Sequence, residues 1–270
     1  MARSAEPAPP PALRAWARSL LAAADEDPGW LADRVWRGAR GDPARFRFRV
    51  EALARGVPLA HLEGRVGFHA VELLAGPEAL VPRSDSECLL EALLDHLPVV
   101  PPGPAPLLDL GTGSGCLLLG FLHLRPAWRG VGADVSRRAL TLAERNRRRL
   151  CLERRASLVR SDWWRGLTGR FAAVVSNPPY VVPGEELGPG VAEHEPHAAL
   201  FTPEGDPLWA YRHVLAGAAE RLAPPGVVVL EVGAGRADAV VGLARELGFL
   251  ACERRRDLGG VERALVLRPA

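Results

Sequence analysis

The stretch from Val174 to Tyr180 contains residue types that could do chemistry. An apolar strand pattern over residues 171–175 runs into Asn177, and two prolines follow it. Because proline has no backbone N–H, sheet pairing and helix formation both stop there. The turn presents an amide side chain, backbone carbonyls outside regular pairing, and the ring of Tyr180. This set suits binding of a small planar polar group, and a simple strand-ending Asn-Pro turn is the alternative.

A glycine-rich turn follows an earlier apolar strand pattern at residues 107–110. Gly111, Gly113 and Gly115 allow a ligand to approach the backbone and allow the next helix to pack closely on the strand. The G-x-G-x-G spacing differs from the G-x-G-x-x-G of dinucleotide sites, and no G-x-x-x-x-G-K phosphate-binding loop is present. The turn therefore indicates a ligand site without naming the ligand.

Asp134 lies at the end of the next strand pattern, residues 130–133. It comes twenty-five residues after Asp109. An acid at this place can accept hydrogen bonds from both hydroxyls of a ribose. The alternative is an N-cap for a helix over 137–150, a role that Ser136 could also fill.

A third strand pattern, residues 156–160, is followed by Asp162 and Trp163. The Asp162 carboxylate could bind the amino group of adenine, and Trp163 could pack on the adenine ring. Core packing is the alternative for Trp163. Three strand ends that carry glycines, an acid and Asp-Trp predict an adenosyl-binding site, with Asn177 at the fourth strand end beside it.

Strand and helix patterns alternate from residue 107 onward, which predicts an α/β fold with a mostly parallel sheet covered on both faces. A tight connection at 257–260 predicts an antiparallel pair at the sheet edge. We expect strands at 107–110, 130–133, 156–160, 172–176, 226–232, 248–254 and 263–267. We expect helices at 115–123, 137–150, 208–222 and 237–247.

The N-terminal part differs from this pattern. Residues 1–12 are rich in Pro and Ala and are expected to be disordered. Residues 13–60 predict a small helical domain, in which Asp-Pro pairs at 27–28 and 42–43 start helices. Residues 61–83 predict a β-hairpin linker. The domain that contains the sheet is expected over 84–270, where it begins with a helix at 84–97 that Ser84 could cap.

The composition excludes several classes of protein. No apolar run approaches the ~18–20 residues that span a membrane, and no signal-peptide pattern is present, so we expect a cytoplasmic protein. The four cysteines are far apart, which argues against a disulfide framework. A metal site is not expected, although His194 and His197 form an H-x-x-H pair.

Base bias in the genome explains the unusual composition. The chain has no Lys, Ile or Gln and only two Asn, so every one of its 34 basic side chains is Arg, against 32 acids. Arg clusters therefore carry little information here, whereas Asn177 gains interest. The basic segment 137–160 could be a solvated helix face or a surface for a macromolecular partner.

These motifs together resemble the S-adenosylmethionine-dependent methyltransferases with an N-P-P-Y motif, and among them the protein-(glutamine-N5) methyltransferases that modify peptide-chain release factors. The resemblance covers most of the chain. It rests on Asp109–Gly115, Asp134, Ser161–Trp163, Ser176–Tyr180, Val81–Arg83, Glu195–Leu200, Tyr211-Arg212 and Asp257–Arg263.

The resemblance implies a Rossmann-like class I methyltransferase sheet of seven strands with the last one antiparallel. It implies methyl transfer from S-adenosyl-L-methionine to the N5 amide of the glutamine in the release-factor GGQ motif, with S-adenosyl-L-homocysteine as product. Such protein methylation belongs to translation termination. We expect a monomer that binds neither membranes nor nucleic acid directly.

The resemblance also assigns residue roles. Asn177, Pro178 and Tyr180 would be catalytic, and together with Pro179 they would bind the substrate amide. The cofactor would be bound by Gly111, Thr112, Gly113, Ser114, Gly115, Asp134, Asp162, Trp163 and Asn177.

Three departures from the family pattern leave methyl transfer intact but bear on the substrate. Ser84 and Ser86 stand where the family usually has Pro and Thr, Pro207 replaces a usual Gly, and Arg236 stands near the place of a common Gln. A related group that methylates a ribosomal-protein glutamine also has Arg-Ser at 83–84. Glutamine methylation of a ribosomal protein and amino methylation of DNA or RNA therefore stay as alternatives.

Overall fold

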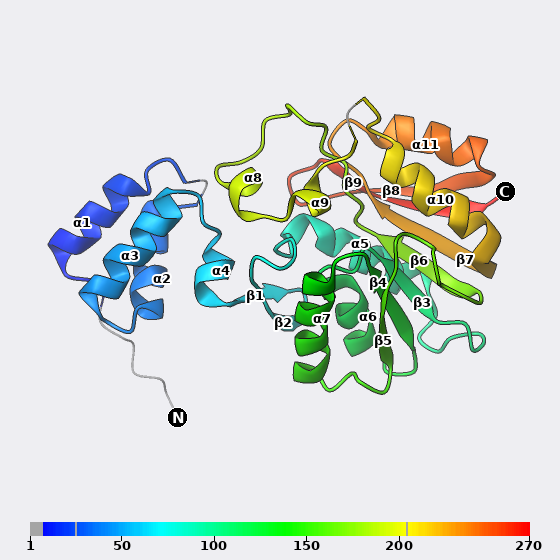
Figure 1. The fold of residues 1–270 in the computed structure, drawn as a ribbon, viewed down its shortest axis with the longest axis horizontal. Coiled ribbons are helices and arrows are strands. Elements are labelled where there is room, and N and C mark those ends of the chain that lie inside the picture. The colour runs from blue at the N-terminus through cyan, green and yellow to red at the C-terminus, as the bar shows by residue number, and fades with distance from the viewer. Residues whose placement is uncertain (1–7, 25, 204) are drawn as a thin grey trace. The chain divides into compact units, whose positions relative to one another are not determined.

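The structure is a computed structural model that describes residues 8–24, 26–203 and 205–270 (Figure 1). None of the helices in these residues is long and apolar enough to cross a membrane.

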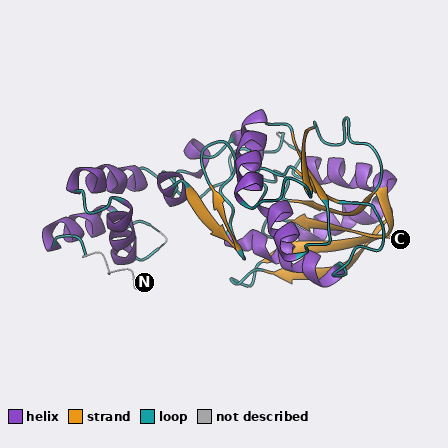
Figure 2. Cartoon of the chain, turned by 90° about the horizontal axis from the view of Figure 1, so that it is seen from below, coloured by secondary structure: helices purple, strands orange, loops and turns teal. Residues whose placement is uncertain are grey.

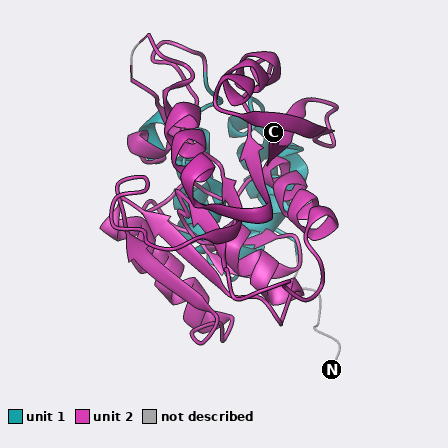
Figure 3. Cartoon of the chain, turned by 90° about the vertical axis from the view of Figure 1, so that its right-hand side faces the viewer, with its two compact units in different colours: residues 1–64, 187–194 teal, residues 65–186, 195–270 magenta. Residues whose placement is uncertain are grey.

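The chain divides into two compact units, which Figure 3 shows in two colours. One unit holds the residues up to Gly64 together with Leu187–His194. The other holds Arg65–Glu186 and Glu195–Ala270. A segment that follows the N-P-P-Y motif in the sequence is thus part of the N-terminal helical unit.

The first unit is built from short helices, and α2 and α3 among them start at the Asp-Pro pairs. The helices are α1 (Pro11–Leu20), α2 (Pro28–Gly38), α3 (Pro43–Ala54) and α4 (Leu59–Glu63). As predicted, Asp27 and Asp42 accept hydrogen bonds from the first-turn N–H groups of α2 and α3. Phe46 lies at the centre of the core, with its ring 5.2 Å from that of Trp36 and 6.4 Å from that of Trp16.

The disordered tail expected over 1–12 is wrong at its end. Residues 11 and 12 already belong to α1, because a proline at the first helical position has its φ set for a helix and needs no N–H partner there. Residues 1–7 of that prediction lie outside the described residues.

A two-stranded hairpin opens the second unit. Its strands β1 (Arg65–Phe68) and β2 (Val71–Leu74) pair antiparallel and are drawn among the orange strands of Figure 2. Asn146 fixes the hairpin to the rest of the unit, because its side chain accepts from the Leu74 N–H and donates to the Leu74 and Ser114 carbonyls.

The helix predicted over 84–97 is divided in two. Residues Ser84–Ser86 form the 3₁₀-helix η1, and α5 follows at Glu87–His96. The predicted cap by Ser84 is wrong, since no side chain caps either helix. Glu87 instead accepts a hydrogen bond from the His69 N–H at 2.8 Å.

The described residues form a seven-stranded sheet in the order β5-β4-β3-β6-β7-β9-β8. β9 pairs antiparallel with β7 and with β8, and the other pairs of the sheet are parallel, which confirms the predicted α/β class and the antiparallel last strand. The strands are β3 (Leu107–Leu110), β4 (Gly130–Asp134), β5 (Ala156–Arg160), β6 (Phe171–Ser176), β7 (Leu222–Glu231), β8 (Phe249–Arg256) and β9 (Glu262–Pro269).

Helices cover both faces of the sheet (Figure 1). Because successive strand residues point to opposite faces, Leu107 packs in one buried cluster with α5 and α6, whereas Leu108 and Leu110 pack in another with α10 and α11. The helices that follow the strands are α6 (Cys116–Leu124), α7 (Arg137–Arg149), α10 (Trp209–Arg221) and α11 (Ala237–Glu246). Two short helical turns, α8 (Val191–His194) and α9 (His197–Leu200), lie between β6 and α10 in the sequence.

Two glycines bring Leu187–His194 close to the helices of the first unit. A Cβ atom on Gly190 would lie 2.1 Å from the carbonyl oxygen of Gly56, and both glycines have positive φ. His194 also hydrogen-bonds the Arg55 carbonyl at 3.2 Å. The contact of backbone with backbone leaves no space for a side chain.

Gly190→Ala is therefore expected to release Leu187–His194 from the helices. Limited proteolysis should cut this segment at least several times faster than in the wild type. Gly64→Ala is the matched control, because Gly64 also has positive φ but a Cβ there would meet nothing within 4 Å. Equal cleavage rates in the two variants would contradict the packing role of Gly190.

Candidate active site

A cavity of about 450 Å³ lies at the carboxyl ends of β3, β4, β5 and β6, and its size is that of a small-molecule site. The segments 78–83 and 196–203 complete its walls. Of the residues predicted to form the site, those that line the cavity are Gly111, Thr112, Gly113, Ser114, Asp134, Asp162, Trp163, Asn177 and Pro179, whereas Gly115, Pro178 and Tyr180 do not.

The glycine-rich turn has the backbone that its sequence requires. Gly111, Gly113 and Gly115 all have positive φ, which other residues rarely adopt. Gly115 does not line the cavity; it is the N-cap of α6, where a Cβ atom would come 2.9 Å from the Leu119 side chain. Its role is the close packing of helix on strand.

Asp109 is a cavity residue that the site prediction left out. Its Oδ2 accepts from the Thr112 hydroxyl at 2.7 Å and from the Leu118 N–H at 3.2 Å. Its Oδ1 is buried and has no hydrogen-bond partner among the described residues. Burial raises the pKa of Asp109 to about 7. A carboxylate inside the apolar strand Leu107–Leu110 was the signal that could have identified it.

Asp134 joins the end of β4 to the glycine-rich turn. Its Oδ2 accepts from the Gly113 N–H at 2.9 Å, and its Oδ1 accepts from the Ser136 N–H at 2.8 Å. Ser136 caps α7 through the Ala139 N–H, so the alternative cap role falls to Ser136. Burial raises the pKa of Asp134, and each of its oxygens keeps a lone pair for a further donor.

Aromatic rings form one wall of the cavity. Trp163 stacks on His213 with ring centroids 5.2 Å apart and meets Trp209 edge-on at 5.4 Å. Trp209 also lines the cavity. Asp162, the residue before Trp163, lines it too and is exposed. Trp164 is a core residue instead, because its Nε1 donates to the His213 carbonyl and its side chain is buried.

The N-P-P-Y segment leaves the sheet where β6 ends. The Ser176 hydroxyl donates to the Leu110 carbonyl at 2.6 Å, which holds the end of β6 against β3. Asn177 then lines the cavity, and its Nδ2 donates to the Ser86 hydroxyl at 3.2 Å. The amide oxygen of Asn177 is thereby left on the opposite side of the side chain.

Tyr180 is fixed at both its ends. Its hydroxyl donates to Glu231 Oε1 at 3.1 Å, and burial raises its pKa. Its carbonyl accepts from the guanidinium of Arg236, which also pairs with Glu185. Arg236, which stands near the place of the expected Gln, thus has a structural contact.

Glu195 connects two walls of the cavity and was not among the predicted site residues. Its carboxylate is fully buried and accepts from the Val81 N–H at 3.2 Å and from Arg83 at 3.1 Å. Ser86 and Glu231 were missed as well. Glu195 meets Val81 across 114 positions and Ser86 meets Glu231 across 145, so no local pattern could reveal these contacts.

Comparisons with known proteins place the chain in a family of methyltransferases. The profile of the methyltransferase small domain matches residues 86–193. The release factor glutamine methyltransferase of Rhodospirillum rubrum is 41% identical over 78% of this chain, which spans 64% of that relative's length. The release factor glutamine methyltransferase of Agrobacterium fabrum is 36% identical over 84% of this chain and 80% of its own.

Solved structures agree on the fold. A ribosomal protein L11 methylase from Lactobacillus delbrueckii superposes with a TM-score of 0.53 at 16% identity, covering 71% of this chain and 81% of its own. The 16S rRNA N2 G1207 methyltransferase of T. thermophilus, solved with AdoMet and guanosine, has a TM-score of 0.54 at 22% identity and covers 76% and 50%. On the identity and coverage of its curated relatives, this chain belongs to the family of the release factor glutamine methyltransferases.

Proposed function

We propose that this protein transfers a methyl group from S-adenosyl-L-methionine to the side-chain amide nitrogen of a glutamine in a peptide-chain release factor. The observation that carries the proposal is the orientation of Asn177. Its amide oxygen remains available as an acceptor beside a cavity of cofactor size. The relatives act on the glutamine of a release factor, as their names say, and this supports the same substrate class here.

The cavity residues fit the parts of this cofactor. Asp109 Oδ1, which is buried and has no partner within the described part of the chain, suits a cationic ammonium group. The remaining lone pairs of Asp134 suit the ribose hydroxyls, and Asp162 and Trp163 suit the amino group and ring of adenine. The backbone of the Gly111–Gly115 turn allows close approach. When bound, the cofactor supplies a methyl group that its sulfonium makes electrophilic.

The task of the N-P-P-Y segment is to hold a weak nucleophile in place. An amide nitrogen is a poor nucleophile because its lone pair is delocalised, so alignment must supply much of the rate. The hydrogens on that nitrogen become more acidic as it attacks. Asn177 Oδ1 and the Pro178 carbonyl would accept them, which stabilises the transition state more than the ground state. Tyr180 and Pro179 would pack against the substrate amide.

The helical unit would recruit the protein substrate. We assign this role to residues 13–60, the hairpin linker to 61–83 and the catalytic domain to 84–270, and we propose that the protein acts as a monomer. The departure at Ser86 keeps the hydroxyl that Thr would provide, and this hydroxyl contacts Asn177. Nothing in the site is therefore lost through that departure.

Asn177→Ala is expected to lower kcat by ~10²-fold or more, the scale of losing one pre-organised polar partner in a transition state. The Kd of the cofactor should change much less, because its other contacts remain. Turnover and a cofactor titration on the same preparation check this. Equal losses in both would give Asn177 a purely structural role.

Cofactor affinity is expected to depend on pH through Asp109, whose pKa lies at about 7. The carboxylate is ionised above this pKa and attracts the ammonium, so affinity should fall as pH drops from 7.5 to 5.5. Asp109→Asn should lower affinity by roughly 10-fold or more at pH 7.5, on the scale of a hydrogen bond to a charged group, and should flatten the profile. Calorimetric titrations across this range would refute the assignment if both profiles had the same slope.

Labelled cofactor offered with a release factor, a ribosomal protein, DNA or RNA identifies the substrate. We expect label in the release factor, at a glutamine side chain located by mass spectrometry of its peptides. Label only in the ribosomal protein would support glutamine methylation but would replace the release factor as the proposed substrate. Label only in nucleic acid would overturn the proposed function.

A further inference from the structure

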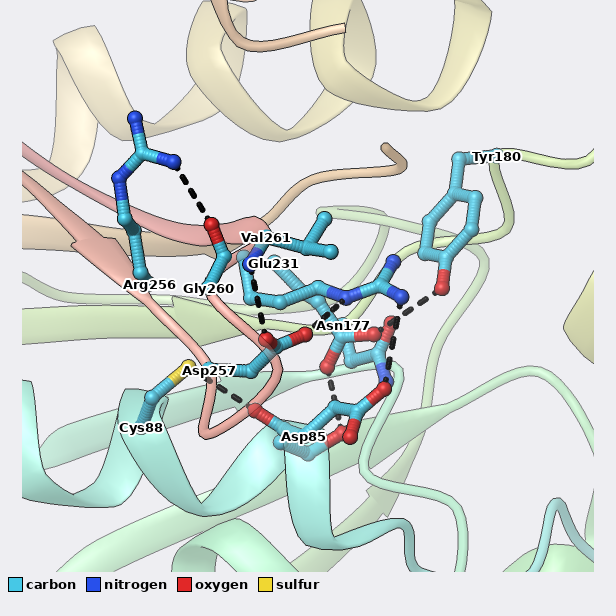
Figure 4. A network of polar contacts seen from close by, with 11 residues as sticks. Asp85, Cys88, Asn177, Tyr180, Glu231, Arg256, Asp257, Gly260 and Val261 are labelled. Atoms are coloured by element: carbon cyan, nitrogen blue, oxygen red, sulfur yellow. Dashed lines mark hydrogen bonds and ion pairs between the residues drawn. The ribbon is translucent and has the colours of Figure 1, made fainter. Parts of the chain in front are cut away.

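A chain of hydrogen bonds connects Asn177 to a buried carboxylate at the end of β7 (Figure 4). Glu231 is 3% exposed, and its Oε2 accepts from the Ser86 hydroxyl at 2.5 Å. The same Ser86 oxygen accepts from Asn177 Nδ2 at 3.2 Å. The other carboxylate oxygen, Oε1, accepts from the Tyr180 hydroxyl at 3.1 Å. One acid thus contacts, directly or through Ser86, two side chains of the N-P-P-Y segment.

The chemistry of these groups sets the direction of the whole chain. An ionised carboxylate only accepts hydrogen bonds, so the single hydroxyl hydrogen of Ser86 must go to Glu231. Ser86 can then only accept from Asn177, which requires Nδ2 on its side. The carboxylate therefore determines which end of the Asn177 amide is the acceptor that remains available.

The groups around Glu231 act on its pKa in both directions, and burial has the largest effect. Burial raises its pKa, whereas the two hydroxyl donors and the nearby Arg263 guanidinium lower it, and Asp85 raises it. Arg263 itself forms ion pairs with Asp257 at 3.0 Å and with Asp85 at 3.4 Å. Glu231 of β7 therefore lies among charged side chains from η1 and β9, namely Asp85 and Arg263.

We infer that Glu231 is a positioning residue for methyl transfer: through Ser86 it turns the Asn177 amide oxygen toward the substrate, and it holds the Tyr180 ring directly. This inference rests on the proposed function, in which Asn177 accepts a hydrogen from the substrate amide. Glu231 itself does not line the cavity, so it acts through its neighbours.

Glu231→Gln tests the inference with almost no change in shape. A glutamine amide has one acceptor and one donor end, so it cannot accept from both Ser86 and Tyr180. If its NH₂ faces Ser86, that hydroxyl donates to Asn177 and the amide flips, with Nδ2 toward the substrate. We expect kcat to fall by ~10²-fold, the scale of losing one transition-state acceptor. The Kd of the cofactor should stay within about threefold, on the ground that free energies for well-separated contacts add independently.

Ser86 supplies the second test. Ser86→Ala should lower kcat in the same direction, and Ser86→Thr, which keeps the hydroxyl, should recover most of it. In the double variant Glu231→Gln/Ser86→Ala, the second change should cost little further, because residues that act as one unit are not additive. Glu220→Gln, an exposed acid on α10, is the control for the acid-to-amide change.

The assays use the full chain, labelled cofactor and the substrate that the wild type methylates. Wild-type kcat in Glu231→Gln, or fully additive losses in the double variant, would overturn this inference and leave the proposed function standing. A loss of cofactor binding equal to the loss of kcat would also overturn it, since that would make Glu231 a general support of the fold. A wild type that methylates no glutamine would overturn the proposed function and this inference together.

Discussion

The parallel pairing of β3 with both β4 and β6 is the constraint on which the site depends. Parallel strands end at the same edge of a sheet, so Asp109, Asp134 and Asn177 reach one cavity from distant parts of the chain. The helices after β3 and after β6 pack on opposite faces, which opens a crevice between these strand ends. The two prolines then stop β6 at the rim of the crevice, so the backbone after Asn177 is not drawn into further pairing.

Two buried carboxylates show how the protein divides structural from functional polarity. Burial of an acid costs free energy unless donors surround it, and burial raises the pKa of both Asp109 and Glu231. Glu231 uses both its oxygens inside the protein. Asp109, which lines the cavity, uses one oxygen, and the other has no partner among residues 8–24, 26–203 and 205–270. A buried acceptor without a partner is costly in the free protein and becomes favourable when a cationic group reaches it. The first acid therefore organises neighbours, and the second suits a ligand.

Local patterns in the sequence predicted the parts of the fold that depend on near neighbours. Strands 107–110 and 156–160 lie where the strand patterns of the sequence place them, and the Asp-Pro pairs start α2 and α3. The predicted Ser84 cap is wrong because α5 begins at Glu87, with Ser86 as its N-cap. The Ser86 hydroxyl donates to Glu231, 145 positions away, which no local pattern shows. The contact between Glu195 and Val81 spans 114 positions, so no local pattern shows it either. Strand ends therefore predicted the part of the cavity lining at β3, β4, β5 and β6. Ser86 and Glu231, which orient Asn177, could be found only in the tertiary structure.

The scarcity of amides in this chain shows where an amide is indispensable. Only Asn146 and Asn177 occur, and there is no Gln. Asn146 is fully buried, where it accepts from one N–H and donates to two carbonyls. Asn177 donates to Ser86 and keeps its oxygen as an acceptor. An acid could not donate and an arginine could not accept, so neither could replace these side chains. The two amide side chains of this sequence thus stand at places where one side chain donates one hydrogen bond and offers an acceptor for another.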